Sequence, residues 1–143
     1  MRIDLESVVA HPVERVFAVM SDPARRPQWQ ENTSNVEILT PGPTALGTRW
    51  REASRGIGAV EVVVVGFEAC ALWQEAGTAG GGDGRVTVRF ATDGEGATRL
   101  TITVEVRLRR LRRVMAGALQ PIVARQMPKD LARLEALLDA VNG

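Results

Sequence analysis

The stretch AHPVERVFAVMSDPARRPQW, residues 10–29, contains two short helical segments, each opened by a proline. Apolar residues recur at helical spacing after Pro12, where a proline costs little because its missing N–H would have no helical partner. Asp22 is then a suitable N-cap for a second piece that starts at Pro23. The stretch therefore predicts two short helices that turn the chain and end at Trp29.

Strand patterns lie on both sides of this corner. Ile3 to Val9 reads as a first strand. After the corner, alternation of apolar and polar residues predicts six more strands, around residues 36–38, 48–54, 60–67, 71–78, 86–90 and 100–108. Turn sequences separate them, namely PGP at 41–43, Gly56 with Gly58, GGGDG at 80–84 and DGEG at 93–96. We expect GGGDG to be a flexible hairpin loop.

In the last third of the chain, from Leu111 to the end, apolar residues recur at spacings of three and four residues, which predicts one long helix. Pro121 and Pro128 lie inside it, and Pro128 should remove a backbone hydrogen bond and bend the helix. The chain has 143 residues, enough for one domain, so residues 1–143 are expected to form a single α+β unit. One helix cannot fill the concave face of a strongly curved seven-stranded sheet, and we expect a cavity between them.

Composition excludes several classes of protein. The formal net charge is +1, which offers no general attraction for nucleic acid. Cys70 is the only cysteine, so neither an internal disulfide nor a multi-thiolate metal site is expected. No apolar run approaches the roughly 18 residues of a membrane helix, and MRIDLESVVA does not resemble a signal peptide. We expect a cytoplasmic protein without integral membrane association, and no cofactor or metal.

The chain resembles the START-like superfamily, also called Bet v 1-like or SRPBCC, and within it the bacterial polyketide cyclase/dehydrase type, because several motifs occur along it in the order typical of that family. HPVERVFAVMSDPARRPQW, PGPTALGTRWRE, GATRLTITVEV and DLARLEALLD carry the resemblance over nearly the whole chain. It implies the helix-grip fold, in which a curved antiparallel sheet of seven strands wraps around a long C-terminal helix, with two short helices between strands one and two. It also implies a ligand pocket under that helix. Because this fold hosts many functions, the resemblance is specific for fold and poorly specific for function.

We therefore expect a small, largely apolar ligand, lipid- or polyketide-like, with Trp29 at a gate to the pocket. Large aromatic and aliphatic side chains supply most of the contact area in such pockets. The ligand-binding candidates are Trp29, Val36, Ile38, Trp50, Phe90, Ile102, Val104, Met115, Leu119 and Ile122, and the polar candidates are Arg49, Glu52 and Gln126.

Two other functions stay open, a cyclase or dehydratase and a module that binds a protein partner; a homodimer is possible in each case. An enzyme of this fold is expected to use Tyr, His or Arg in its cavity, but tyrosine is absent and His11 is the only histidine. At a strand-to-helix corner, His11 is expected to cap or to be exposed rather than to act as a base. No catalytic residue is assigned.

The segment RLRRLRR, residues 107–113, holds five arginines in seven residues. It could form a patch for anions such as membrane phosphates. The simpler interpretation is a strand end that leads into a helix, with arginines toward solvent and Leu108 and Leu111 inside.

Overall fold

In the computed structural model the chain is described over residues 1–109 and 113–142, with the backbone alone at 113–116 and 142. Its elements follow the predicted order, with the second short helix divided into a 3₁₀ turn and an α-helical turn. They are β1 (Arg2–Val9), α1 (Val13–Met20), η1 (Pro23–Arg25), α2 (Arg26–Trp29), β2 (Thr33–Ile38), β3 (Arg49–Ser54), β4 (Gly58–Glu68), β5 (Leu72–Ala79), β6 (Gly82–Thr92), β7 (Thr98–Leu108) and α3 (Arg113–Asn142).

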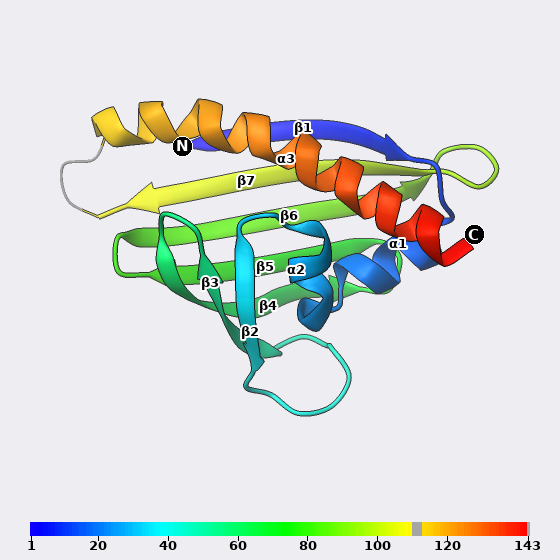
Figure 1. Cartoon of the computed structure of the whole chain (residues 1–143), viewed down its shortest axis with the longest axis horizontal. Coiled ribbons are helices and arrows are strands. Elements are labelled where there is room, and N and C mark those ends of the chain that lie inside the picture. The colour runs from blue at the N-terminus through cyan, green and yellow to red at the C-terminus, as the bar shows by residue number, and fades with distance from the viewer. Residues whose placement is uncertain (110–112, 143) are drawn as a thin grey trace.

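The seven strands form one antiparallel sheet in the order β1-β7-β6-β5-β4-β3-β2. The chain crosses from one edge of the sheet, β1, to the other edge, β2, through α1, η1 and α2. Figure 1 shows α3 lying along the sheet on the same side as these short helices, with its end close to α1. This arrangement is the predicted helix-grip architecture, a curved sheet closed by one long helix.

The corner between α1 and α2 follows the predicted chemistry. The Asp22 side chain accepts a hydrogen bond from the Ala24 N–H at 3.2 Å, which caps η1, and Pro23 follows it directly. A second proline, Pro27, lies in the first turn of α2. Each proline lacks an N–H that the start of a helix leaves unpaired in any case, so two short helices form where one longer helix would be broken.

The predicted flexible loop at residues 80–84 is shorter than expected. Strand β6 already begins at Gly82, which pairs with Leu108, so only Gly80 and Gly81 remain at the turn. A Cβ at Gly82 would lie 2.3 Å from the carbonyl oxygen of Arg107. The glycine therefore allows a close backbone approach between β6 and β7, and the prediction of a loop over residues 82–84 was wrong.

The core lies under the second half of α3. Leu131, Leu134 and Leu138 are buried there against α1 and the sheet. In contrast, every side chain from residue 117 to 130 is exposed or only half-buried. The helix continues through Pro121 and Pro128 without a break. Its first half therefore covers the sheet without packing closely on it.

Polar contacts join α3 to the β1–α1 corner. His11 is 5% exposed, and its Nε2 lies 2.6 Å from Asp139 Oδ1. Arg15 Nη1 donates to His11 Nδ1 at 3.1 Å, so the ring proton is on Nε2 and is donated to Asp139. Arg15 Nη2 also donates to the Leu138 carbonyl. Of the two expectations for His11, capping or exposure, exposure was wrong, because the end of α3 packs over the corner and buries the ring.

A second polar contact lies farther along α3. Asp130 Oδ1 accepts hydrogen bonds from the Glu31 N–H at 3.2 Å and from Gln126 Nε2 at 2.8 Å. Burial raises the pKa of Asp130 above its ordinary value, and these hydrogen bonds offset only part of that effect. Ionised Asp130 therefore costs stability.

Removing the histidine ring should loosen the end of α3. His11→Ala removes a buried ring together with its hydrogen bonds to Asp139 and Arg15, and we expect the free energy of unfolding to fall by about 1–3 kcal/mol. Asp139→Asn keeps an oxygen that accepts from Nε2–H, so it should cost less than Asp139→Ala. Urea unfolding measures both effects; a His11→Ala variant as stable as the unaltered chain would contradict the described contact.

Asp130→Asn should stabilise the fold at neutral pH. The raised pKa means that the folded state holds the proton more tightly than the unfolded state, so the contribution of Asp130 to stability falls as pH rises through that pKa. Asparagine keeps an acceptor oxygen and carries no charge. We expect a higher melting temperature at pH 7 and no gain at low pH, where Asp130 is protonated in both states. A lower melting temperature at pH 7 would contradict this.

Candidate functional site

On three strands, β3, β5 and β6, the inward-facing residues become smaller from one end of the sheet to the other. Large aromatic residues fill the end near α1, and glycine, alanine or serine lies at the hairpin tips. The inward series are Trp50, Glu52, Ser54 on β3, Trp73, Glu75, Gly77, Ala79 on β5, and Phe90, Val88, Val86, Gly84, Gly82 on β6. The described side chains of α3, from residue 117 on, leave this space open, with Leu119 and Val123 at its wall.

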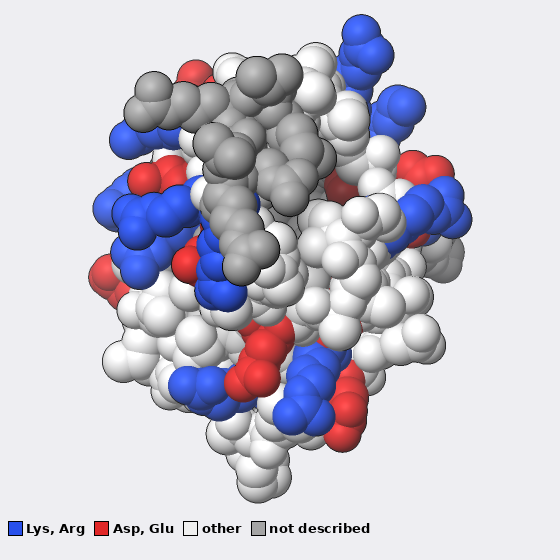
Figure 2. Space-filling model, turned by 90° about the vertical axis from the view of Figure 1, so that its left-hand side faces the viewer, with Lys and Arg blue, Asp and Glu red and all other residues white. Residues whose placement is uncertain are grey.

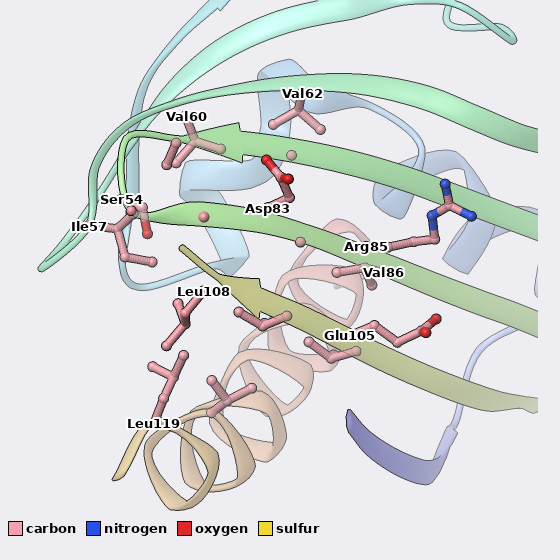
Figure 3. Close-up of a pocket in the computed structure, with 18 of the residues that line it drawn as sticks. Ser54, Ile57, Val60, Val62, Asp83, Arg85, Val86, Glu105, Leu108 and Leu119 are labelled. Carbon is pink, nitrogen blue, oxygen red and sulfur yellow. The ribbon is translucent and has the colours of Figure 1, made fainter. Parts of the chain in front are cut away.

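A pocket of about 930 Å³ occupies this space. Figure 3 shows aliphatic side chains from several elements around it, including Val62 of β4, Val86 of β6, Leu108 of β7 and Leu119 of α3. The exposed lining residues, such as Ile57 and Gly81, lie at the hairpin tips and form its mouth. Figure 2 faces this end of the molecule, where uncharged residues lie between charged side chains. The volume lies in the range of pockets that hold small ligands.

The inner end of the pocket is polar and charged. Arg26, at the start of α2, inserts under the sheet and is 7% exposed. Its Nη1 donates to Glu75 Oε1 at 2.7 Å and its Nη2 to Glu75 Oε2 at 3.1 Å. The guanidinium also lies over the Trp50 ring, 5.2 Å from the ring centre. The two-point ion pair and the stacking fix the side chain of Arg26 in one position.

Glu52 is the second carboxylate beside Arg26, and it is 6% exposed. Its Oε1 accepts a hydrogen bond from the Trp50 indole N–H at 2.7 Å, as Glu75 Oε1 accepts one from the Trp73 indole N–H at 2.9 Å. Arg26 Nε lies 3.1 Å from Glu52 Oε1, but out of line for a hydrogen bond. Each carboxylate is thus held by the tryptophan two residues earlier on its own strand.

Electrostatics explains why Arg26 remains charged in this place. Burial alone would lower the pKa of its guanidinium, but the neighbouring charges of Glu75 and Glu52 outweigh that effect and raise the pKa. A buried cation with no partner would be very costly, and one with two carboxylates is not. Near the mouth, a separate ion pair joins Arg109 to Asp83 at 3.1 Å.

Only some of the sequence-predicted residues reach the pocket. Glu52, Val104 and Leu119 line it. Four others lie in the packed core outside its lining, namely Trp29, Trp50, Phe90 and Ile102. Trp29 follows Arg26 in α2, so it lies beyond the closed end of the pocket and not at its mouth. The geometry therefore does not place Trp29 at an entrance.

The remaining candidates lie elsewhere for identifiable reasons. The register between β2 and β3 shifts between Ser34 and Glu37, and this irregularity turns Val36 toward the core; Ile38, on the edge strand, is 42% exposed. Ile122 is 61% exposed, because α3 turns Leu119 and Val123 toward the pocket instead. Arg49 pairs with Glu61 on the outer surface at 3.0 Å, and Gln126 bonds Glu31 and Asp130. The side chain of Met115 lies outside the described residues.

The arginine-rich segment 107–113 is described only in part. Arg107 and Arg109 are exposed, Arg109 pairs with Asp83, and Leu108 turns into the pocket. These three residues agree with the interpretation as a strand end. Residues 110–112, with Leu111 among them, lie outside the described part of the chain.

Sequence reasoning missed Arg26 and Glu75, which form the centre of the charged cluster. A signal for Glu75 was present, because the sequence holds the same three-residue pattern twice, Trp50-Arg51-Glu52 and Trp73-Gln74-Glu75. Residues two apart on a strand share a face, so each glutamate points to the same side of the sheet as the tryptophan before it. Arg26 had no comparable signal, since its direction depends on how the two prolines turn the chain.

Comparison with known proteins defines the family. Residues 1–139 match the model of the family described as polyketide cyclase/dehydrase and lipid transport. No curated protein matches the chain. In the described part of the chain, no helix is long and apolar enough to cross a membrane.

Solved structures share the fold at low sequence identity. A protein of Thermus thermophilus has a TM-score of 0.79 at 17% identity, with 100% of both chains covered. A START superfamily protein of Mycobacterium smegmatis has a TM-score of 0.76 at 17% identity and covers 95% of this chain and 98% of its own. A truncated norcoclaurine synthase of Thalictrum flavum has a TM-score of 0.72 at 14% identity, covering 96% and 92%.

The family match over residues 1–139 agrees with the observed fold, in which the elements follow the helix-grip order and the curved sheet closes against α3. The chain belongs to the polyketide cyclase/dehydrase and lipid transport family, and it shares its fold with a START superfamily protein.

Proposed function

We propose that this protein binds a small, largely apolar molecule in the pocket between the sheet and the first half of α3, as a carrier or sensor. The observation that carries the proposal is the open space of about 930 Å³ beneath α3, lined mainly by aliphatic side chains. A buried space of this size with an apolar wall is normally filled by larger side chains unless a ligand uses it. Here the inward glycines at positions 77 and 84 keep it open.

The distribution of polar groups supports an oriented ligand. The walls are apolar, whereas Arg26, Glu52 and Glu75 are gathered at the inner end. A few polar groups at one end of an apolar pocket fix the orientation of a ligand, while apolar contact supplies most of the affinity. The ligand would bind with its polar end at the inner end of the pocket and its apolar part toward the mouth.

Binding explains the site better than catalysis does. Each carboxylate accepts a hydrogen bond from the tryptophan of its own strand, and Glu75 also accepts two from Arg26. His11, the only histidine of the sequence, is bonded to Asp139 and Arg15 and does not line the pocket. A module that only binds a protein partner would not require the open space, which argues against that alternative.

Filling the pocket from β6 tests the proposal. Gly84 lies on the inner face, and a Cβ there would meet only the Glu105 carbonyl oxygen, at 3.6 Å, an ordinary contact. Gly84→Leu should therefore fold and occupy the space of the ligand. We expect its affinity for the neutral fluorescent probe N-phenyl-1-naphthylamine to fall by roughly tenfold or more. A fluorescence titration gives the dissociation constant.

The matched control is Ala91→Leu, which places the same side chain on the exposed outer face of β6. It should bind the probe as the unaltered protein does. If folded Gly84→Leu, checked by circular dichroism, binds the probe with unchanged affinity, the ligand site is not this pocket. If the unaltered protein binds neither this probe nor any apolar compound of a lipid and polyketide panel, the binding function itself is refuted.

A further inference from the structure

The buried cluster at the inner end of the pocket carries one positive and two negative side chains, Arg26 with Glu52 and Glu75. We infer that Glu52 serves as the counter-ion for a protonated amine at the leading end of the ligand. This inference rests on the proposed binding function and adds the chemical class of the ligand's polar group.

Arg26 forms ion pairs with both carboxylates, but it holds Glu75 more firmly than Glu52. Both terminal nitrogens of the guanidinium donate to the two oxygens of Glu75, at 2.7 and 3.1 Å. A two-point pair of this kind is the strongest arrangement that an arginine makes with a carboxylate. The remaining Nε lies near Glu52 but forms no hydrogen bond with it. One guanidinium thus faces two carboxylates, so the cluster carries one negative charge in excess, and Glu52 is the carboxylate that Arg26 holds less firmly.

Glu52 also lacks a full set of hydrogen-bond donors. Its Oε1 has the Trp50 indole N–H, but the donor near Oε2 is the Thr33 hydroxyl, at 3.2 Å. That hydroxyl has a single proton and lies closer to Gln30 Oε1, at 2.8 Å. When Thr33 donates to Gln30, Glu52 Oε2 is left without a donor.

A group bound in the pocket can donate hydrogen bonds to the Glu52 carboxylate and balance its charge. Glu52 lines the pocket and is only 6% exposed, so a group bound there would reach it without competition from bulk water. An ammonium supplies up to three donors and a compensating positive charge. A carboxylate head group would instead meet the excess negative charge of the cluster in a poorly hydrated site, which is unfavourable.

Among the described residues, the other charged side chains that line the pocket do not change this balance. Besides the cluster, the pocket is lined by Asp83, Arg85, Glu105 and Arg109, which are exposed residues toward its outer part. Asp83 pairs with Arg109 at 3.1 Å. Counted over the described residues, the lining charges remain more negative than positive, which also favours a cation over an anion.

Three probes with the same apolar chain test the inference, namely decylamine, decan-1-ol and decanoate at pH 7.4. Displacement of N-phenyl-1-naphthylamine gives the three affinities. We expect decylamine to bind at least roughly tenfold more tightly than decanoate, with decan-1-ol between them. Glu52→Gln keeps an oxygen for the Trp50 indole and removes the charge. In this variant the preference for decylamine over decanoate should disappear.

Glu61→Gln is the control, because it removes an exposed carboxylate on the outer face and should keep the preference. Equal affinity of the unaltered protein for decylamine and decanoate would overturn the counter-ion role, and so would an amine preference that survives in Glu52→Gln. If Glu52→Gln does not fold, as judged by its circular dichroism melt, the comparison of probes on the unaltered protein decides alone. Binding of decan-1-ol with no amine preference refutes this inference but leaves the proposed function standing, whereas no binding of any probe refutes both.

Discussion

The burial of Arg26 between two glutamates is the constraint on which the site depends. A guanidinium this deeply buried must be paired, and its partners come from two strands of the sheet, β3 and β5. The short helix α2 must therefore lie where its first residue can reach both strands. The two prolines at positions 23 and 27 turn the chain into that position, which explains why one longer helix is replaced by short ones.

The same cluster divides the interior into a packed part and an open part. On its inner side Trp50 and Trp73 fill the space against the core, and on its outer side the inward residues shrink to Gly77 and Gly84. The long helix follows this division, since its buried leucines begin only at Leu131. The pocket is thus a consequence of side-chain size along each strand rather than of a special loop or insertion.

The sequence allowed the fold to be predicted and the site only in part. Alternation, proline positions and the helical period indicated the succession of strands and the long C-terminal helix, because each is a local property of the chain. Glu52, Val104 and Leu119 were placed correctly beside the pocket, since strand and helix faces follow from spacing. Ile122 and Ile38 were not, because the rotation of α3 and the edge position of β2 depend on tertiary packing. Arg26 could not be found, since its partners are 26 and 49 positions away in the chain.

The most direct test of the charged cluster as the inner wall of a ligand pocket is a nuclear magnetic resonance titration of the indole N–H signals with decan-1-ol. The protein has three tryptophans, which Trp→Phe variants assign one by one. Trp50 and Trp73 donate to Glu52 and Glu75, so their signals should shift when the ligand reaches those carboxylates, while that of Trp29 should remain in place. Saturable binding that shifts the Trp29 signal alone, or none of the three, would contradict this account.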